Sequence, residues 1–262
     1  MRAILVGIAV GWMFAPLRAD MPELLKEAGH KVSEDTDRWA YTETTVVKDN
    51  KGRARGETVV QVDPSKPYAE QFTPLKINGK KPTESQLKQY RRRGERKAEE
   101  RSKTERTQAE AAPGAAPRVT INGAETAVDL DHIAVVEEDA NRITYDLPLR
   151  GARQGVSMEN FQLLLRVNKP ARTLESASLR VRAPFRTKLV VKVNRGAFDL
   201  DFVSVDPQYA PPLTAMRGDL AVSLLFVKVA AKVELKRTEF RRVKPYDEHF
   251  LVKLGPLQFL SF

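Results

Sequence analysis

The chain has 262 residues, a formal net charge of +10 and no cysteine. The absence of cysteine excludes disulfides, thiolate metal sites and a lipid anchor on an N-terminal cysteine. A chain of this size buries about 70% of its unfolded surface, so it can fold as one large domain or two small ones without covalent cross-links.

The first nineteen residues have the layout of a secretory signal peptide. Arg2 is followed by an uncharged, mostly apolar run over residues 4–17, and Ala19 provides a small residue before Asp20. The run is shorter than the roughly 20 apolar residues that span a bilayer. We therefore expect residues 1–19 to be a signal peptide cleaved after Ala19, and the protein to be periplasmic and not membrane-spanning after cleavage. An uncleaved anchor or a buried first helix is the alternative.

Residues 20–82 are expected to form an N-terminal helix and the first strands of a β domain. An apolar stripe at helical spacing predicts a short amphipathic helix, and its members are Leu24, Leu25, Ala28 and Val32. Three segments then have the alternation or the β-rich composition of strands and are separated by turn residues. They are residues 38–47, 57–62 and 72–77.

The most charged part of the chain lies in residues 83–117, which we expect to be a charged helix followed by a low-complexity linker. Thr83 and Gln86 form a capping box. Opposite charges four residues apart, such as Arg91 and Glu95, each contribute about 0.2–0.5 kcal/mol, whereas Gly94 costs about 1 kcal/mol. Because few apolar residues follow, the pattern favours a solvated spacer.

The alternative is that this helix is a basic arm that contacts anionic lipid headgroups or acidic cell-wall polymer. The arm would use Arg91, Arg92, Arg93, Arg96 and Lys97. Export argues against nucleic acid as a partner, and the sequence lacks the aromatic and basic interleaving that stacks bases.

Residues 118–262 are expected to form the main antiparallel sheet. Apolar and charged residues alternate over 179–183, 188–193 and 198–202, with a turn predicted at 194–196. Residues 220–231 are apolar on both faces, which is typical of a helix or of a covered strand, and the neighbouring strands favour one long central strand. The fold class is therefore mainly β: a curled antiparallel sheet, half-barrel-like, with an N-terminal amphipathic helix and an inserted charged helix.

No motif in the sequence names a reaction. The three histidines, His30, His132 and His249, have no partner at catalytic or metal-binding spacing, and neither a nucleophile motif nor a glycine-rich phosphate loop occurs. Two Asp-Leu-Asp pairs place carboxylates on one strand face, where they can bind a hard cation or act in acid–base catalysis. A solvated outer face is the simpler interpretation, and we expect a non-catalytic protein without cofactor or metal. The pairs are Asp129/Asp131 and Asp199/Asp201.

The feature of the sequence that most suggests a binding site is a set of apolar and aromatic residues that share strand faces. They are either core or the lining of a cavity for a lipid or acyl chain. The candidate ligand-binding residues are Trp39, Tyr41, Phe198, Leu200, Phe202, Leu224 and Phe226.

The layout of signal peptide, opening helix, long antiparallel strands and apolar inner face resembles the LolA/LolB-like periplasmic carriers. That resemblance implies a half-barrel closed by helices that binds the acyl chains of lipoproteins or other lipids. The stretch over residues 37–90 also resembles uncharacterised exported bacterial proteins. Two features depart from the carriers: the charged helix and linker are an insertion, and the missing N-terminal cysteine excludes a lipid-anchored form.

Three hypotheses follow for function. The first is an exported soluble binding protein that holds an apolar or acyl-chain ligand, with basic residues at the rim. The second is a non-catalytic envelope interaction protein with a packed core, which contacts an anionic surface through the basic helix. The third is a hydrolase that uses one of the carboxylate pairs.

Overall fold

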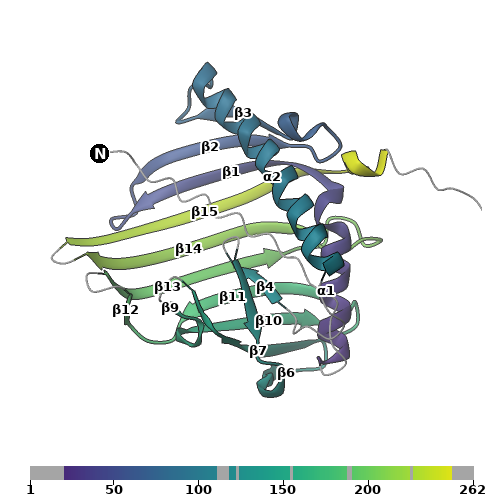
Figure 1. Cartoon of the computed structure of the whole chain (residues 1–262), viewed down its shortest axis with the longest axis vertical. Helices are drawn as coiled ribbons and strands as arrows, with labels where there is room; N and C mark the ends of the chain where they lie inside the picture. The colour runs from purple at the N-terminus through teal and green to yellow at the C-terminus, as the bar shows by residue number, and fades with distance from the viewer. Residues whose placement is uncertain are drawn as a thin grey trace, which may run out of the picture.

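The computed structural model describes residues 21–110, 118–121, 124–153, 156–187, 191–224 and 227–249. The expected signal peptide, its cleavage site and the linker at 111–117 lie outside these residues and stay predictions. Within them the chain is mainly antiparallel β-sheet with two α-helices, as predicted (Figure 1).

Within the described residues, one sheet contains thirteen strands. Its main path runs β3-β2-β1-β15-β14-β13-β11-β10-β7-β5-β4, while β12 pairs with β13 and β6 with β7. The strands are β1 (Trp39–Asp49), β2 (Ala54–Val62), β3 (Phe72–Ile77), β4 (Arg118–Ile121), β5 (Ala124–Val128), β6 (Ala134–Glu138), β7 (Arg142–Arg150), β10 (Phe161–Asn168), β11 (Thr173–Val181), β12 (Phe185–Thr187), β13 (Val191–Phe202), β14 (Leu213–Leu224) and β15 (Val227–Arg242). The short strands β8 (Ala152–Arg153) and β9 (Val156–Ser157) pair separately.

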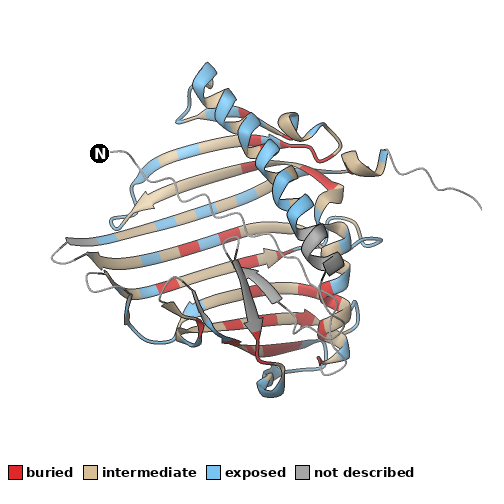
Figure 2. Cartoon of the chain, viewed as in Figure 1, coloured by how far each residue is buried: buried red, intermediate tan, exposed pale blue. Residues whose placement is uncertain are grey.

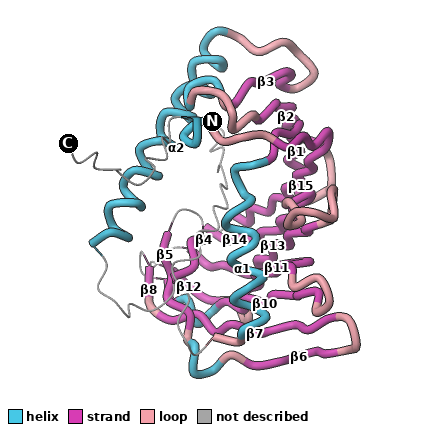
Figure 3. The backbone as a smooth tube through the Cα atoms, turned by 90° about the vertical axis from the view of Figure 1, so that its right-hand side faces the viewer, coloured by secondary structure: helices cyan, strands magenta, loops and turns pink. Residues whose placement is uncertain are grey.

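The pairing of β1 with β15 places the first and the last strand side by side inside the sheet, third and fourth from its β3 edge. The two expected β segments are therefore parts of one sheet. The sheet is open, since its path ends at β3 on one side and at β4 on the other, and it does not curl into the half-barrel that we expected. Both helices lie on the same side of it, which we call the inner face (Figure 3).

Helix α1 (Glu23–Asp35) covers one end of the long strands and packs against β10 and β11. Leu25, Ala28 and Val32 of the predicted stripe are buried, and Leu24 packs beside them. Burial is concentrated in the strands next to this helix (Figure 2). The core residues opposite α1 come from β7, β10, β11, β13 and β14.

Helix α2 (Glu84–Glu110) follows β3 and precedes β4, which are the two ends of the sheet path. Its 27 residues span about 40 Å at 1.5 Å per residue. Eleven strands at a spacing of about 4.8 Å are about 48 Å wide. The charged helix is therefore nearly as long as the sheet is wide, and its main contacts with the body are at the β3 end, with β3 and the preceding turn at residues 68–70.

The capping box that starts α2 is confirmed. The Thr83 backbone N–H donates to Gln86 Oε1 at 2.8 Å, and the Gln86 N–H donates to Thr83 Oγ1 at 3.4 Å.

Two predictions about the strands were wrong. Residues 220–231 are not one long strand: β14 ends at Leu224, β15 begins at Val227, and the two pair as a hairpin. Both faces look apolar in the sequence because the small residues Ala221 and Ala230 pair on the outer face. The turn expected at 194–196 is a register shift inside the continuous strand β13.

Candidate functional site

A small pocket lies where the end of α1, the start of β1, the end of β15 and the loop between β13 and β14 meet. Its volume is about 50 Å³, whereas pockets for drug-sized ligands measure about 300–1,000 Å³. It therefore has room for one functional group of a ligand rather than for a whole acyl chain. The lining residues are Val32, Asp35, Thr36, Trp39, Tyr41, Phe202, Ala210, Pro211, Pro212, Leu213 and Arg237.

Trp39 is the most enclosed aromatic residue of this pocket, with 4% of its surface exposed. Its ring makes edge-to-face contacts with Tyr209, at 6.0 Å between centroids, and with Phe240, at 6.1 Å. The guanidinium carbon of Arg242 lies 5.1 Å from the Trp39 ring centroid and 4.0 Å from that of Tyr209. The indole Nε1 of Trp39 is buried and has no hydrogen-bond partner.

Arg242 is held by the carboxylate at the end of α1. Its Nη2 donates to Asp35 Oδ1, and Asp35 Oδ2 accepts a bond of 2.9 Å from the backbone N–H of Ala210. The other terminal nitrogen, Nη1, is buried without a partner. Two unpaired buried donors thus lie in one aromatic cluster beside the pocket.

A second ion pair borders the pocket on the sheet side. Arg237 Nε donates to Glu43 Oε2 at 3.1 Å, and its guanidinium lies 4.3 Å from the ring centroid of Tyr41. Burial raises the pKa of the Tyr41 hydroxyl above its usual value, although Arg237 acts in the opposite direction. Each cation beside the pocket is therefore matched by a carboxylate.

An apolar row leads from the pocket along the inner face of β15. Alternate residues of a strand share a face, so Leu235, Val233, Ala231 and Val229 continue the side on which Arg237 lies. The row covers about 26 Å from Arg237 to Val229 at 3.3 Å per residue. Its first three members are half-buried.

The row ends in an apolar surface near the tip of the β14–β15 hairpin, which we call the inner patch (Val193, Leu220, Val222 and Val229). Val222 pairs with both Val193 and Val229, so all three point to one face. Leu220 is 40% exposed and Val229 46% exposed. Helix α1 lies at the opposite ends of these strands (Figure 1).

The structure brings together three of the sequence-predicted ligand residues, Trp39, Tyr41 and Phe202, at the pocket. Leu200 is core, and Phe198 is half-buried on the same face, against Gly218. The side chain of Leu224 and the whole of Phe226 lie outside the described residues.

Sequence reasoning missed the polar half of the site. Asp35 and Arg242 are 207 residues apart, and Glu43 and Arg237 are 194 apart. No local pattern links such pairs, because β1 and β15 become neighbours only when the sheet forms.

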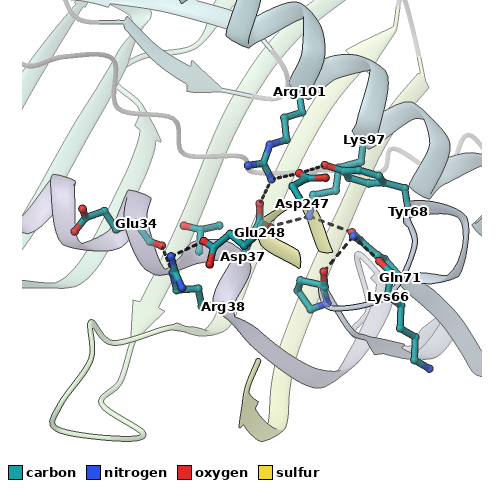
Figure 4. Close-up of polar contacts among 12 residues, drawn as sticks. Glu34, Asp37, Arg38, Lys66, Tyr68, Gln71, Lys97, Arg101, Asp247 and Glu248 are labelled. Atoms are coloured by element: carbon teal, nitrogen blue, oxygen red, sulfur yellow. Dashed lines mark hydrogen bonds and ion pairs between the residues drawn. The ribbon is translucent and has the colours of Figure 1, made fainter. Parts of the chain in front are cut away.

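The charged helix α2 is anchored to the body rather than solvated throughout. Lys97 Nζ lies 2.8 Å from Asp37 Oδ1, and Arg101 lies 3.0 Å from Asp247 Oδ2 (Figure 4). Tyr68 donates a hydrogen bond of 2.6 Å to the same Asp247 carboxylate. The prediction of a solvated spacer is therefore wrong for this part of the helix.

Two of the five predicted basic-contact residues are thus used internally, Lys97 in its ion pair and Arg93 over the Phe72 ring at 4.4 Å. Arg91, Arg92 and Arg96 are exposed. They remain available as the basic contact surface, which we call the arginine surface.

Three of the four carboxylates in the Asp-Leu-Asp pairs bond to neighbouring side chains of the fold. Asp199 accepts from Ser178 and Asp201 pairs with Arg217, on the face away from the helices. Asp129 is buried and lies 2.6 Å from Arg150 and 2.9 Å from His132.

Asp131 belongs to the 3₁₀ turn Leu130–His132 rather than to a strand face shared with Asp129. Across the residues that the structure describes, no three His, Asp or Glu side chains are grouped to hold a metal ion.

No family model and no curated protein matches the chain. Among solved structures, it is similar to a LolA superfamily protein of Nitrosomonas europaea, with 8% identity and a TM-score of 0.38 over 88% of this chain and 96% of that one. None of the described helices is long and apolar enough to cross a membrane.

Proposed function

We propose that this protein is an exported carrier that holds an apolar or acyl-chain ligand against the inner face of its sheet. The observation that carries the proposal is the inner patch, where two large aliphatic side chains are 40% and 46% exposed on the face of the sheet that carries both helices. Folded proteins rarely leave contiguous apolar surface in water without a binding role.

The apolar row of β15 supports the same function, because it joins this patch to the pocket at Trp39. The methylene groups of an acyl chain lying on this row would be removed from water. Each buried CH₂ contributes about 0.8 kcal/mol to binding. Arg237 and Arg242 lie at the pocket end of the row and supply polar groups for the end of such a ligand.

The first test is native mass spectrometry of the protein purified from a periplasmic extract without detergent, followed by organic extraction. The proposal predicts an adduct of lipid mass that disappears on extraction. A bare polypeptide mass that does not change when an acyl lipid is added contradicts it.

A pair of variants locates the site. Val229→Lys places a charge on the inner patch and should abolish the lipid adduct. Val136→Lys on β6 is the matched control, because Val136 is 52% exposed and lies on a strand far along the sheet path from β15. Equal loss in both variants would contradict binding at the inner patch.

The second candidate is an envelope interaction protein that contacts anionic lipid or cell-wall polymer. It is favoured by the arginine surface, where three exposed guanidinium groups gather within six positions of α2. This contact is compatible with the carrier function, since the inner face and the outer side of α2 are different surfaces.

A further inference from the structure

Trp39 carries a hydrogen-bond donor that its own surroundings do not satisfy. Its Nε1 is buried without an acceptor, and the groups packed on the ring are Tyr209, Phe240 and the guanidinium of Arg242. A phenylalanine ring and a guanidinium carry no acceptor, and the Tyr209 hydroxyl makes no hydrogen bond with Nε1. Buried donors are nearly always paired in folded proteins, so an unpaired one needs an explanation.

A second donor with the same deficit lies beside it. Arg242 Nη1 is buried and unpaired, although Nη2 of the same group is bonded to Asp35. Trp39 and Asp35 both line the 50 Å³ pocket. The site therefore offers two donors next to a space that is large enough for one oxygen-bearing group.

The charges around the pocket favour an uncharged group. Arg242 is neutralised by Asp35, and Arg237 by Glu43. Because both of these arginines are already paired, an incoming anion would gain little from them and would lie close to the Asp35 carboxylate. Burying a charge without a partner is costly. A carbonyl oxygen accepts hydrogen bonds without that cost.

We propose that this pocket is the subsite for a neutral carbonyl, an ester or amide oxygen of the acyl ligand, which accepts a hydrogen bond from Trp39 Nε1 with Arg242 Nη1 as the second donor. This inference rests on the proposed carrier function. It adds that the protein selects acylated molecules over plain hydrocarbons and free fatty acids, with the acyl chain leaving the pocket along the row on β15.

The test compares three probes with sixteen-carbon chains. The probes are 1-hexadecanoylglycerol, which has an ester carbonyl, 1-hexadecylglycerol, the ether that lacks only that carbonyl, and the hexadecanoate anion. Affinities are measured by isothermal titration calorimetry on the mature chain, residues 20–262, so that the readout does not depend on Trp39.

The wild-type site should bind the ester about 3–10-fold more tightly than the ether, the range expected for one net hydrogen bond. Trp39→Phe keeps an aromatic ring but removes one of the two donors, so the ratio of ester to ether affinity should fall by about 3-fold or more. Tyr68→Phe, which removes a hydrogen-bond donor that bonds Asp247 and does not line the pocket, should leave the ratio unchanged.

A second measurement uses the wild-type protein alone, so it does not depend on whether Trp39→Phe folds. It is nuclear magnetic resonance of the ¹⁵N-labelled indole of Trp39. The ester should move the Trp39 Nε1 proton downfield, and the ether should not. Equal wild-type affinities for ester and ether, or an ester preference that is undiminished in Trp39→Phe, would overturn the carbonyl subsite while leaving the carrier function intact.

Tighter binding of the hexadecanoate anion than of the ester would overturn the assignment of an uncharged ligand. If none of the three probes binds and no lipid copurifies, the carrier function fails and the subsite fails with it.

Discussion

A β-carbon on Gly94 would lie 1.7 Å from the carbonyl oxygen of Tyr68. Glycine at this position lets α2 approach the 3₁₀ turn η2 (Tyr68–Glu70) until the two backbones touch. The residue that looks like a defect in an isolated helix is therefore the point of closest contact between α2 and the body. The ion pairs of Lys97 and Arg101 with Asp37 and Asp247 continue the same interface by one and two further turns.

Gly94→Ala should destabilise the protein or displace α2. Alanine improves helix propensity by about 1 kcal/mol, but the clash is with backbone, and overpacking of this kind costs about 1–3 kcal/mol. Urea unfolding measures the net change, and amide exchange of α2 reports its displacement. Gly56→Ala is the matched control, because a β-carbon there meets only Asn78 Oδ1 at an ordinary 3.6 Å. A stabilised Gly94→Ala protein would contradict the close approach.

The Tyr68 hydroxyl should lose its proton at an unusually high pH. Burial and the hydrogen bond to Asp247 raise its pKa to about 12, against the opposing effect of Arg101. Because the folded pKa exceeds the unfolded value of about 10, the stability contributed by this phenol is fully present below about pH 10. It is lost as the pH rises from about 10 towards 12.

The difference in tyrosinate absorbance between the wild type and Tyr68→Phe isolates this titration. The stability advantage of the wild type over Tyr68→Phe should shrink between pH 9 and pH 11.5 when the free energy of unfolding is measured at both. A Tyr68 midpoint near pH 10 would contradict the buried hydrogen bond.

The arginine surface should bind anionic vesicles in a salt-sensitive way if the second candidate function is right. The triple variant Arg91→Gln/Arg92→Gln/Arg96→Gln should lose sedimentation with vesicles that contain phosphatidylglycerol. Raising the ionic strength above about 0.15 M should have the same effect, since the Debye length there is only about 8 Å.

A matched triple variant at three exposed lysines near β3, with Lys76, Lys80 and Lys81 changed to glutamine, removes the same charge and is the control. Equal loss of vesicle binding in both variants would mean that net charge, and not the arginine surface, is responsible.

Local patterns were enough to predict the elements whose signals are short in range. The stripe of α1, the capping box of α2 and the strand 72–77 all depend on residues within a few positions of each other. Apolar alternation also identified the residues of β13 that enter the core, Leu200 and Phe202.

The sequence alone determined the fold class, the positions of the helices and of most strands, and the inward-facing positions of Trp39 and Phe202, because periodicity indicates which side chains are removed from water. Tertiary structure alone decided the order of the strands, the open sheet, and the pairing of Asp35 with Arg242 and of Glu43 with Arg237. These contacts join residues about 200 positions apart. Only the packing of the whole chain brings them within bonding distance and leaves the Trp39 donor buried beside them.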